Sequence, residues 1–244
     1  GTTESGQPYF AMELVRGLPI TQYCDEHRLS VRQRLELFIA VCHAVQHAHQ
    51  KGVIHRDLKP SNILITEADG VPEPRVIDFG IAKALGQQLT DLTLITQLGH
   101  AIGTAAYMSP EQAESSGTDV DTRADIYSLG VLMYEVLVGE LPTDPSAIGI
   151  HAYLARLMAR ESDPQTPSAR LDSLRLDPTV VAKARRTDIG HLRRQMRGDL
   201  DWIVMKAMDP DRSRRYATAN GLAMDIQRYL ANEPVIARPP STLY

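Results

Sequence analysis

The strongest chemical signal in the chain is a run of polar side chains around residue 57. Residues 55–62 read HRDLKPSN and hold a carboxylate, an ammonium group and a carboxamide within six positions. Phosphoryl transfer asks little covalent chemistry of a protein. It needs an aligned hydroxyl, a cation near the moving oxygens and ligands for magnesium. Asp57 can accept the hydroxyl proton, Lys59 can neutralise phosphoryl charge, and Asn62 can offer an amide oxygen to the metal.

A second acidic motif follows sixteen residues after Asn62. Asp78-Phe79-Gly80 places an oxygen ligand beside one bulky apolar residue and one flexible residue. Magnesium in proteins takes a few carboxylate or amide oxygens together with phosphate oxygens and water. Asn62 and Asp78 supply that kind of ligand set.

Helix and strand signals flank both motifs. Ser30, with Gln33 three residues later, forms a capping-box pattern that predicts the start of a helix. This helix is expected to end near Lys51-Gly52, and its apolar residues recur at helical spacing: Leu35, Phe38, Cys42 and Val45. Two apolar runs, at residues 63–65 and 76–77, predict a small hairpin. Residues 55–62 are therefore expected to form a loop between a helix and a strand.

The rest of the chain reads mainly as helices. Residues 124–137 predict a helix that is apolar nearly all round and therefore buried, closed by Gly139. Residues 80–103 show no sustained period and predict a long loop, which in a compact domain is usually functional. Residues 164–197 are polar and basic and give no assignment. The remaining signals are a short strand at Tyr9 to Val15, a helix entry at 18–21, and helical stripes at 200–208 and 222–230.

The composition argues against several classes of protein. The 244 residues are 43% hydrophobic and 23% charged, as in an ordinary globular domain. The net charge of -4 gives no overall attraction to nucleic acid or acidic membranes. The most apolar stretch, residues 126–139, is interrupted by Glu135 and is too short to span a bilayer. Cys24 and Cys42 lie in helical patterns and predict two buried, reduced thiols in a cytoplasmic protein.

The motifs together resemble those of protein kinases. Residues 55–62 resemble the catalytic loop of that family, and Asp78-Phe79-Gly80 resembles its magnesium-binding motif. Later motifs resemble the same family in the same order, and five in correct order and spacing make coincidence negligible. They are Gly103-Thr104 of the substrate-facing loop, Ser109-Pro110-Glu111 closing the activation segment with Ser in place of the usual Ala, Asp125 and Gly130 of the central helix, and the late Arg215 that pairs with Glu111.

The resemblance implies an α+β, mainly α architecture: a protein-kinase-like fold consisting of the large C-terminal lobe with only the hinge strand of the small lobe. Residues 1–17 would form the last small-lobe strand and the hinge. Residues 18–234 would form the lobe, with an activation segment at 78–111 and an insertion at about 160–197. Residues 235–244 would be a tail or linker.

The resemblance also implies a role for each site residue. Asp57, Lys59 and Asn62 would be catalytic, and Asn62 and Asp78 would bind Mg²⁺. ATP would contact Met12 behind the adenine, the backbone of Glu13 and Val15 at its edge, and Leu64 below it. Activation would involve Arg56, Phe79, Gly80, Thr104 and Glu111, with Thr90, Thr93 and Thr96 as phosphosites that Arg56 binds. His55, Asp125 and Arg215 would be structural, with Asp125 hydrogen-bonding the catalytic-loop backbone.

The implied function is a bacterial serine/threonine protein kinase that moves the ATP γ-phosphoryl group to protein hydroxyls. Lys59 beside Asp57 is typical of serine/threonine rather than tyrosine kinases. No glycine-rich loop, strand lysine or helix glutamate of the small lobe is found in the 244 residues. We therefore expect a truncated piece of a longer protein that is weakly active or inactive on its own and depends on the missing small lobe.

Two rival functions are weighed against the kinase. A pseudokinase or scaffold module would not need to retain Asp57, Lys59, Asn62 and Asp78. A small-molecule phosphotransferase of related fold would lack Thr104 and the Ser109-Pro110-Glu111 segment, so their presence favours protein substrates.

Several residues have a simpler interpretation. His43 and His47 share a helix face but have no third ligand in view, so ordinary helix residues are favoured over a metal site. Asp125 could be a helix-start charge, and Glu111 and Arg215 could each be solvated. Trp202 is interpreted as core, and Thr166-Pro167 and Ser168 are assigned no role. A solvated insertion is favoured over a docking surface for a basic cluster comprising Lys183, Arg185, Arg186, Arg193, Arg194 and Arg197.

Overall fold

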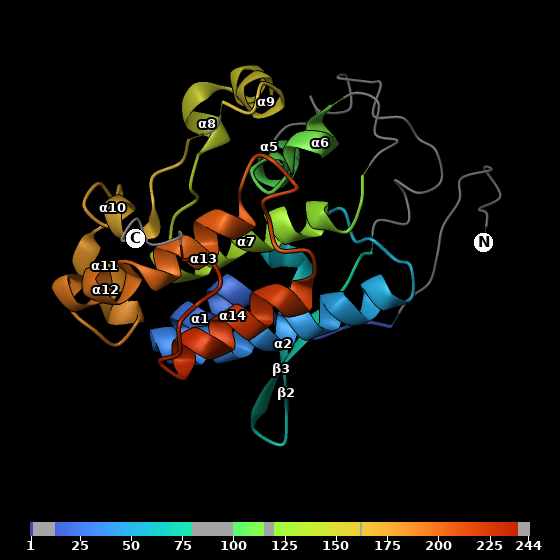
Figure 1. The fold of residues 1–244 in the computed structure, drawn as a ribbon. Coiled ribbons are helices and arrows are strands. Elements are labelled where there is room, and N and C mark those ends of the chain that lie inside the picture. The colour runs from blue at the N-terminus through green and yellow to red at the C-terminus, as the bar shows by residue number, and fades with distance from the viewer. Residues whose placement is uncertain (2–12, 80–99, 115–119, 162, 239–244) are drawn as a thin grey trace.

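The computed structural model describes residue 1 and residues 13–79, 100–114, 120–161 and 163–238 (Figure 1). These residues form a mainly helical body with one small sheet at its edge. The first elements are β1 (Leu18–Pro19), α1 (Ile20–Glu26) and α2 (Val31–Gln50), followed by a 3-10 turn at Pro60–Asn62, β2 (Ile63–Ala68) and β3 (Val71–Val76). Beyond residue 99 come α5 (His100–Ala105), α6 (Pro110–Ala113), α7 (Arg123–Val138), α8 (Pro145–Ile148) and α9 (Ile150–Met158). The last are α10 (Pro167–Arg170), α11 (Pro178–Ala184), α12 (Ile189–Met196), α13 (Asp199–Ala207) and α14 (Ala219–Leu230).

Helix α2 starts and ends where the sequence predicts. Ser30 Oγ accepts a hydrogen bond from Gln33 N at 3.3 Å, and Ser30 N donates to Gln33 Oε1 at 3.0 Å, so the predicted capping box is formed. Gly52 follows the helix with φ 75°, a conformation that glycine adopts without steric cost. The C-terminal end of α2 therefore delivers the chain directly into residues 55–62.

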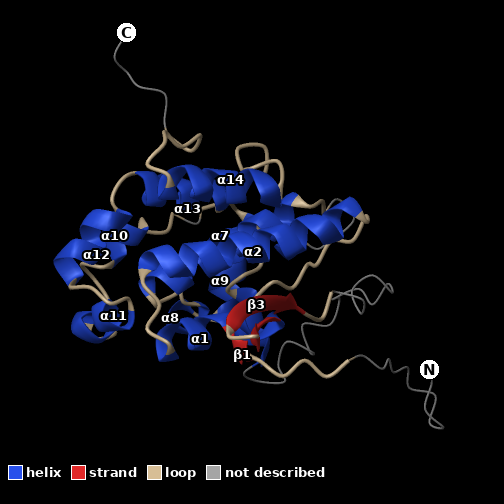
Figure 2. Cartoon of the chain, turned by 90° about the horizontal axis from the view of Figure 1, so that it is seen from below, coloured by secondary structure: helices blue, strands red, loops and turns tan. Residues whose placement is uncertain are grey.

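Helix α7 is the central element of the core. Its side chains are buried on every face, apart from the partly exposed Arg123 and Glu135. It packs against α1, α2, α10, α13 and α14, and Figure 2 shows α13 and α14 on one side of it and α1 and α8 on the other. Gly139 ends the helix with φ 89°. The prediction of a fully buried helix closed by this glycine is confirmed.

The sheet is antiparallel with strand order β1-β2-β3. Leu18 pairs with Ile65, and Ile63 pairs with Val76, so the predicted hairpin is present. Gly17 approaches β2 so closely that an added Cβ would lie 2.7 Å from Ile65 O. A side chain at this position would push the segment that precedes β1 away from the hairpin.

Two predictions from the sequence need correction, and one region that the sequence left unassigned can now be described. Glu13 to Val15 are not in a strand, and the rest of the strand predicted from Tyr9 lies outside the described residues. The predicted loop at 80–103 ends in helix, because α5 includes residues 100–103 and Thr104. The region at 164–197 is built from α10, α11 and α12, which gather at one end of the body in both views.

The basic cluster within residues 183–197 is not entirely solvated. Arg185 is 2% exposed, and its guanidinium donates to the carbonyl oxygens of Val136 (3.0 Å), Leu137 and Val181 (3.0 Å). Its charge is tolerated there because carbonyl groups at the end of α7 replace water. Burial lowers the pKa of Arg185 to about 9.

The other five basic residues of this cluster are exposed, as predicted: Lys183, Arg186, Arg193, Arg194 and Arg197.

Several smaller expectations can also be compared with the structure. Cys24 and Cys42 are free and buried, and Trp202 packs against the core, both as predicted. Ser168, assigned no role, is buried and donates through N and Oγ to Asp201 at 2.9 and 2.7 Å. Among the described residues, no helix is long and apolar enough to cross a membrane.

Candidate active site

The three side chains that the sequence singles out in residues 55–62 meet in the structure. Asn62 Nδ2 donates to Asp57 O at 2.8 Å and to Asp57 Oδ2 at 3.0 Å. Lys59 Nζ lies 3.1 Å from the same Oδ2. The 3-10 turn at Pro60–Asn62 brings Asn62 back toward Asp57, so a five-residue separation in sequence becomes direct contact. One carboxylate oxygen thus receives both an amide proton and an ammonium group.

The backbone before Asp57 is held by a fully buried carboxylate. Asp125, in the first turn of α7, accepts hydrogen bonds from His55 N and Arg56 N, each at 2.8 Å. His49 Nε2 lies 2.7 Å from Asp125 Oδ2. Arg56 has φ 64°, a conformation that costs a non-glycine residue free energy. The two backbone bonds to Asp125 offset this cost, and the contact that the sequence suggested for Asp125 is present.

His55 links the catalytic-loop segment to the Asp78 motif. Its Nε2 is 2.8 Å from Ile77 O, so Nε2 carries the proton, and Nδ1 then accepts from Asp57 N at 3.3 Å. Burial lowers the pKa of His55 below its usual value, which favours this neutral form. The imidazole also packs on Phe79, with ring centroids 4.7 Å apart.

Asp78 sits where the β3 end meets the loop that carries Asn62. Ile77 N donates to Asn62 O at 2.9 Å, so Asp78 follows one residue after a direct backbone link to Asn62. Asp78 is exposed and has φ 58°. The structure therefore brings the Asp78 backbone next to the Asp57–Asn62 group, and Asp78 itself faces solvent.

Gly103 and Thr104, which the sequence singles out, both lie on α5. Thr104 Oγ1 accepts from Lys59 Nζ at 2.9 Å, which joins α5 to the catalytic-loop segment. Tyr107 follows α5, and its hydroxyl donates to the Glu135 carboxylate while its carbonyl accepts from Ser128 Oγ at 2.7 Å. Burial raises the pKa of Glu135. These bonds fix residues 104–107 against α7.

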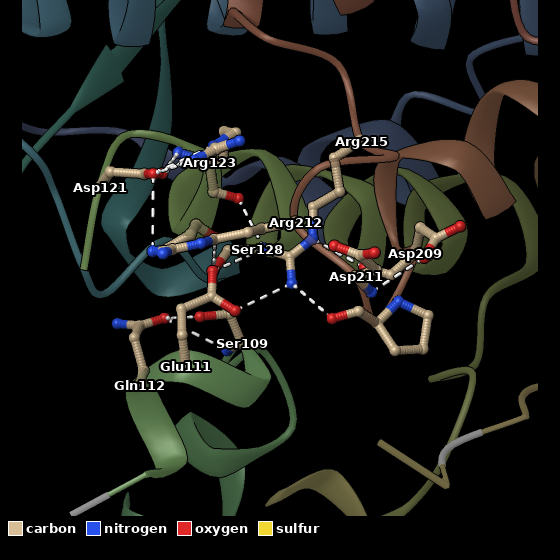
Figure 3. Close-up of polar contacts among 12 residues, drawn as sticks. Ser109, Glu111, Gln112, Asp121, Arg123, Ser128, Asp209, Asp211, Arg212 and Arg215 are labelled. Carbon is tan, nitrogen blue, oxygen red and sulfur yellow. Dashed lines mark hydrogen bonds and ion pairs between the residues drawn. The ribbon is translucent and has the colours of Figure 1, made fainter. Parts of the chain in front are cut away.

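Helix α6 is anchored by a buried ion pair (Figure 3). The Glu111 carboxylate accepts hydrogen bonds from both terminal nitrogens of Arg215. The Nη1–Oε1 distance is 2.6 Å, and the Nη2–Oε2 distance is 2.9 Å. The two side chains are 9% and 0% exposed. Arg215 also donates to Asp209 O at 2.7 Å and to Arg123 O at 2.8 Å, and it lies over the Tyr127 ring. The predicted pair is thus present and buried, which excludes the interpretation that each residue is solvated.

The structure describes three of the four residues that the sequence analysis assigned to adenine binding. Glu13 is exposed, Val15 is half-buried, and Leu64 lies on β2 opposite Pro19 of β1. Leu64 therefore lies beside Gly17 and Pro19, which follow Glu13 and Val15 in the chain. Five predicted residues lie outside the described ones: Met12, Gly80, Thr90, Thr93 and Thr96.

Two contributors to this site were missed by the sequence analysis. His49 contacts Asp125, and its signal was its place on the buried face of α2, seven residues after Cys42. Gln112 forms a capping box with Ser109 and contacts Arg56 O, and its signal was the same S-x-x-Q spacing that marks Ser30. By contrast, no three His, Cys, Asp or Glu side chains in the described part of the chain are placed to hold a metal ion, so His43 and His47 gain no third ligand there.

Comparison with known proteins gives a consistent result. A family model described as the protein kinase domain matches residues 2–220. The chain is 37% identical over 229 residues to the serine/threonine-protein kinase PknB of Mycobacterium tuberculosis, covering 93% of this chain and 31% of that protein. It is 34% identical over 229 residues to the probable serine/threonine-protein kinase SCO3848 of Streptomyces coelicolor, covering 93% and 29%. The chain thus spans about a third of the length of these curated relatives.

A solved structure shows the same fold. The kinase domain of Mycobacterium tuberculosis PknI superposes with a TM-score of 0.57 at 24% identity. The match covers 90% of this chain and 65% of that one. A mainly helical body with a small sheet at its edge, as described above, is therefore a known arrangement.

Proposed function

Because this chain belongs to the protein kinase domain family, we propose that it forms the large catalytic lobe of a serine/threonine protein kinase. The reaction would move the γ-phosphoryl group of ATP to a Ser or Thr hydroxyl of a protein substrate. The curated relatives carry serine/threonine kinase names, and this supports the choice of hydroxyl.

One observation carries the proposal: a single carboxylate oxygen of Asp57 receives both Asn62 Nδ2 and Lys59 Nζ. These two contacts hold that oxygen in place. A carboxylate held in this way can accept the proton of a substrate hydroxyl as its oxygen forms a bond to phosphorus. The bond from phosphorus to the bridging oxygen breaks, and ADP leaves with that oxygen. Lys59, which also contacts Thr104, would then sit beside the negative charge that is moving.

The residues present fit a magnesium ion. Asn62 uses its amide nitrogen on Asp57. Its Oδ1 accepts a long 3.4 Å bond from Ser61, the one bond to this atom among the described residues, so Oδ1 is the atom available to a metal. Asp78 adds an exposed carboxylate one residue after the backbone link to Asn62. Such hard oxygen ligands suit magnesium. Bound there, magnesium would neutralise charge on the ATP phosphates, and Asn62 and Asp78 would hold it.

ATP binding would begin at the segment before β1. The backbone of Glu13 and Val15 would bond the adenine edge, with Met12 behind it and Leu64 below. Residues 1–17 would be the hinge end of a small lobe, residues 18–234 the large lobe, and residues 235–244 a tail. The 244 residues alone would transfer phosphate poorly, because they contain no glycine-rich loop or strand lysine to hold the phosphates.

Regulation would act through the segment at 78–111. We propose that phosphate on Thr90, Thr93 or Thr96 binds Arg56, because guanidinium and phosphate form charge-assisted paired bonds. Arg56 is suited to this by position, since Asp125 holds its backbone immediately before Asp57.

Two free, buried cysteines are also in keeping with a site of action in the cytoplasm.

The test uses protein expressed from the complete gene, with labelled ATP and a Ser/Thr-containing protein substrate. We expect transfer that requires Mg²⁺ and that Asp78→Asn lowers strongly, with a higher Mg²⁺ requirement. Asp69→Asn, in the exposed turn between β2 and β3, is the matched control and should leave transfer unchanged. Nucleotide binding without any transfer would instead support the alternative of a non-catalytic scaffold.

A further inference from the structure

We propose that Gln112 is a positioning residue for Asp57, acting through the peptide group that joins Arg56 to Asp57. This inference rests on the proposed function, because it assigns Asp57 a part in phosphoryl transfer. It concerns a residue on α6, outside the motifs that carry the chemistry.

The contacts of this one peptide group carry the inference. Its carbonyl oxygen, Arg56 O, accepts from Gln112 Nε2 at 2.8 Å. Its N–H, on Asp57, donates to His55 Nδ1 at 3.3 Å. Both polar atoms of the peptide are therefore occupied by side chains. Since the position of the Asp57 side chain follows from the orientation of this peptide plane, Gln112 and His55 together set the direction in which the carboxylate leaves the backbone.

The orientation of the Gln112 amide is fixed by chemistry. Gln112 Oε1 accepts from Ser109 N at 3.2 Å and from Ser109 Oγ at 3.0 Å (Figure 3). A backbone N–H can only donate and a carbonyl oxygen can only accept, so the amide nitrogen must face Arg56 O. Reversing the amide would leave both backbone contacts with the wrong partner.

Gln112 is itself held firmly. It is the third residue of α6, next to Glu111, which is locked to Arg215 by the buried ion pair. Ser109 is fully buried. The Gln112 side chain thus connects a rigid anchor of the lobe to a backbone that is strained at Arg56, with φ 64°. A strained loop keeps its conformation only where neighbours specify it, and Gln112 supplies the contact on the carbonyl side.

The experiment compares Gln112→Met and Gln112→Glu with the unmodified protein, each expressed from the complete gene. Methionine keeps the length of the side chain and removes the donor. We expect kcat to fall about tenfold, with the KM values for ATP and substrate within about twofold of the unmodified protein. Gln46→Met is the control, because Gln46 on α2 also contacts a backbone group: its Oε1 accepts from Asn220 N of α14 at 3.1 Å. It should leave kcat unchanged.

The glutamate variant gives a signature that a purely structural role would not. It keeps an acceptor for Ser109, so α6 stays capped, but when ionised it turns an oxygen toward Arg56 O. On protonation it regains a donor. An ordinary glutamate titrates at about pH 4.3, and the facing carbonyl oxygen of Arg56 would raise the pKa of this carboxyl. The ratio of its kcat to that of the unmodified protein should therefore rise as the pH is lowered from about 7 to about 5, whereas the ratio for Gln112→Met stays flat.

Hydrogen exchange decides the inference independently of activity. In Gln112→Met the amide hydrogens of residues 55–58 should exchange faster than in the unmodified protein and in Gln46→Met. Unchanged exchange in this segment would overturn the inference, as would an unchanged kcat in an active protein. If the unmodified protein transfers no phosphate, the proposed function fails, and the exchange result still shows whether Gln112 holds the peptide.

Discussion

Arg215 and Glu111, which are 104 residues apart in the chain, form a buried bidentate salt bridge. The Nη1–Oε1 distance is 2.6 Å, and the Nη2–Oε2 distance is 2.9 Å. The bridge ties α6, which follows α5 in the chain, to the segment between α13 and α14. Because both side chains are buried, removing either one would leave the charge of the other buried without its ionic partner.

Arg215→Ala should therefore destabilise the lobe by about 3–5 kcal/mol, since it leaves the Glu111 carboxylate buried and unpaired. The free energy of unfolding, measured with a denaturant, checks this. Arg214→Ala is the matched control, because the Arg214 side chain is 75% exposed and faces Asp211 at 4.0 Å. If the two variants were equally stable, the bridge would not support the fold.

Gly130 makes a close contact between α7 and the end of α13. A Cβ added there would lie 2.6 Å from Met208 Cγ and 2.9 Å from Ala207 Cβ. Gly130→Ala would gain about 1 kcal/mol from helix propensity, but crowding against a packed core costs about 1–3 kcal/mol. Because the Ala207 backbone cannot easily move, we expect net destabilisation. Gly103→Ala, at an open position of α5, should not destabilise the fold, and similar melting temperatures for both variants would contradict the packing argument.

The lowered pKa of His55 predicts a pH dependence of stability. In the unfolded chain His55 takes up a proton as the pH falls below about 6.5, whereas the buried residue resists protonation. The unfolded state then binds more protons, so stability is lost as the pH falls through this window. His55→Tyr, which keeps an aromatic ring against Phe79, should lose part of this slope. Glu135, whose pKa burial raises, contributes with the opposite sign in both proteins and cancels in the comparison. Equal slopes would count against a buried neutral His55.

Much of the fold follows from local patterns. The α+β, mainly α kinase-like fold predicted from the motifs is confirmed by the family match and by the PknI likeness. Three elements could be predicted from the sequence because each depends on residues close together in the chain. They are the capping box at Ser30, the β2–β3 hairpin and the buried helix α7. Asn62 and Asp57 were also expected to converge, since only a short turn separates them.

Hydrogen-bond partners that are distant along the chain could not be predicted from the sequence. Arg185 looked like one more surface cation, but it is buried because the carbonyl oxygens of Val136 and Leu137, nearly fifty residues away, end α7 beside it. Ser168 was assigned no role, but Asp201 of α13 accepts two hydrogen bonds from it. Neither of these contacts leaves a periodic pattern or a local motif in the sequence, so both are visible only in the tertiary structure.

The most direct test of the account is the effect of Asp57→Asn on phosphoryl transfer by protein expressed from the complete gene. Asparagine has nearly the same size and shape but cannot take the hydroxyl proton. We predict that kcat falls about 10²–10⁴-fold while the melting temperature and nucleotide affinity are retained. Asp163→Asn, at an exposed position between α9 and α10, should match the unmodified protein. An Asp57→Asn variant with kcat within about threefold of the unmodified protein would contradict the role given to Asp57.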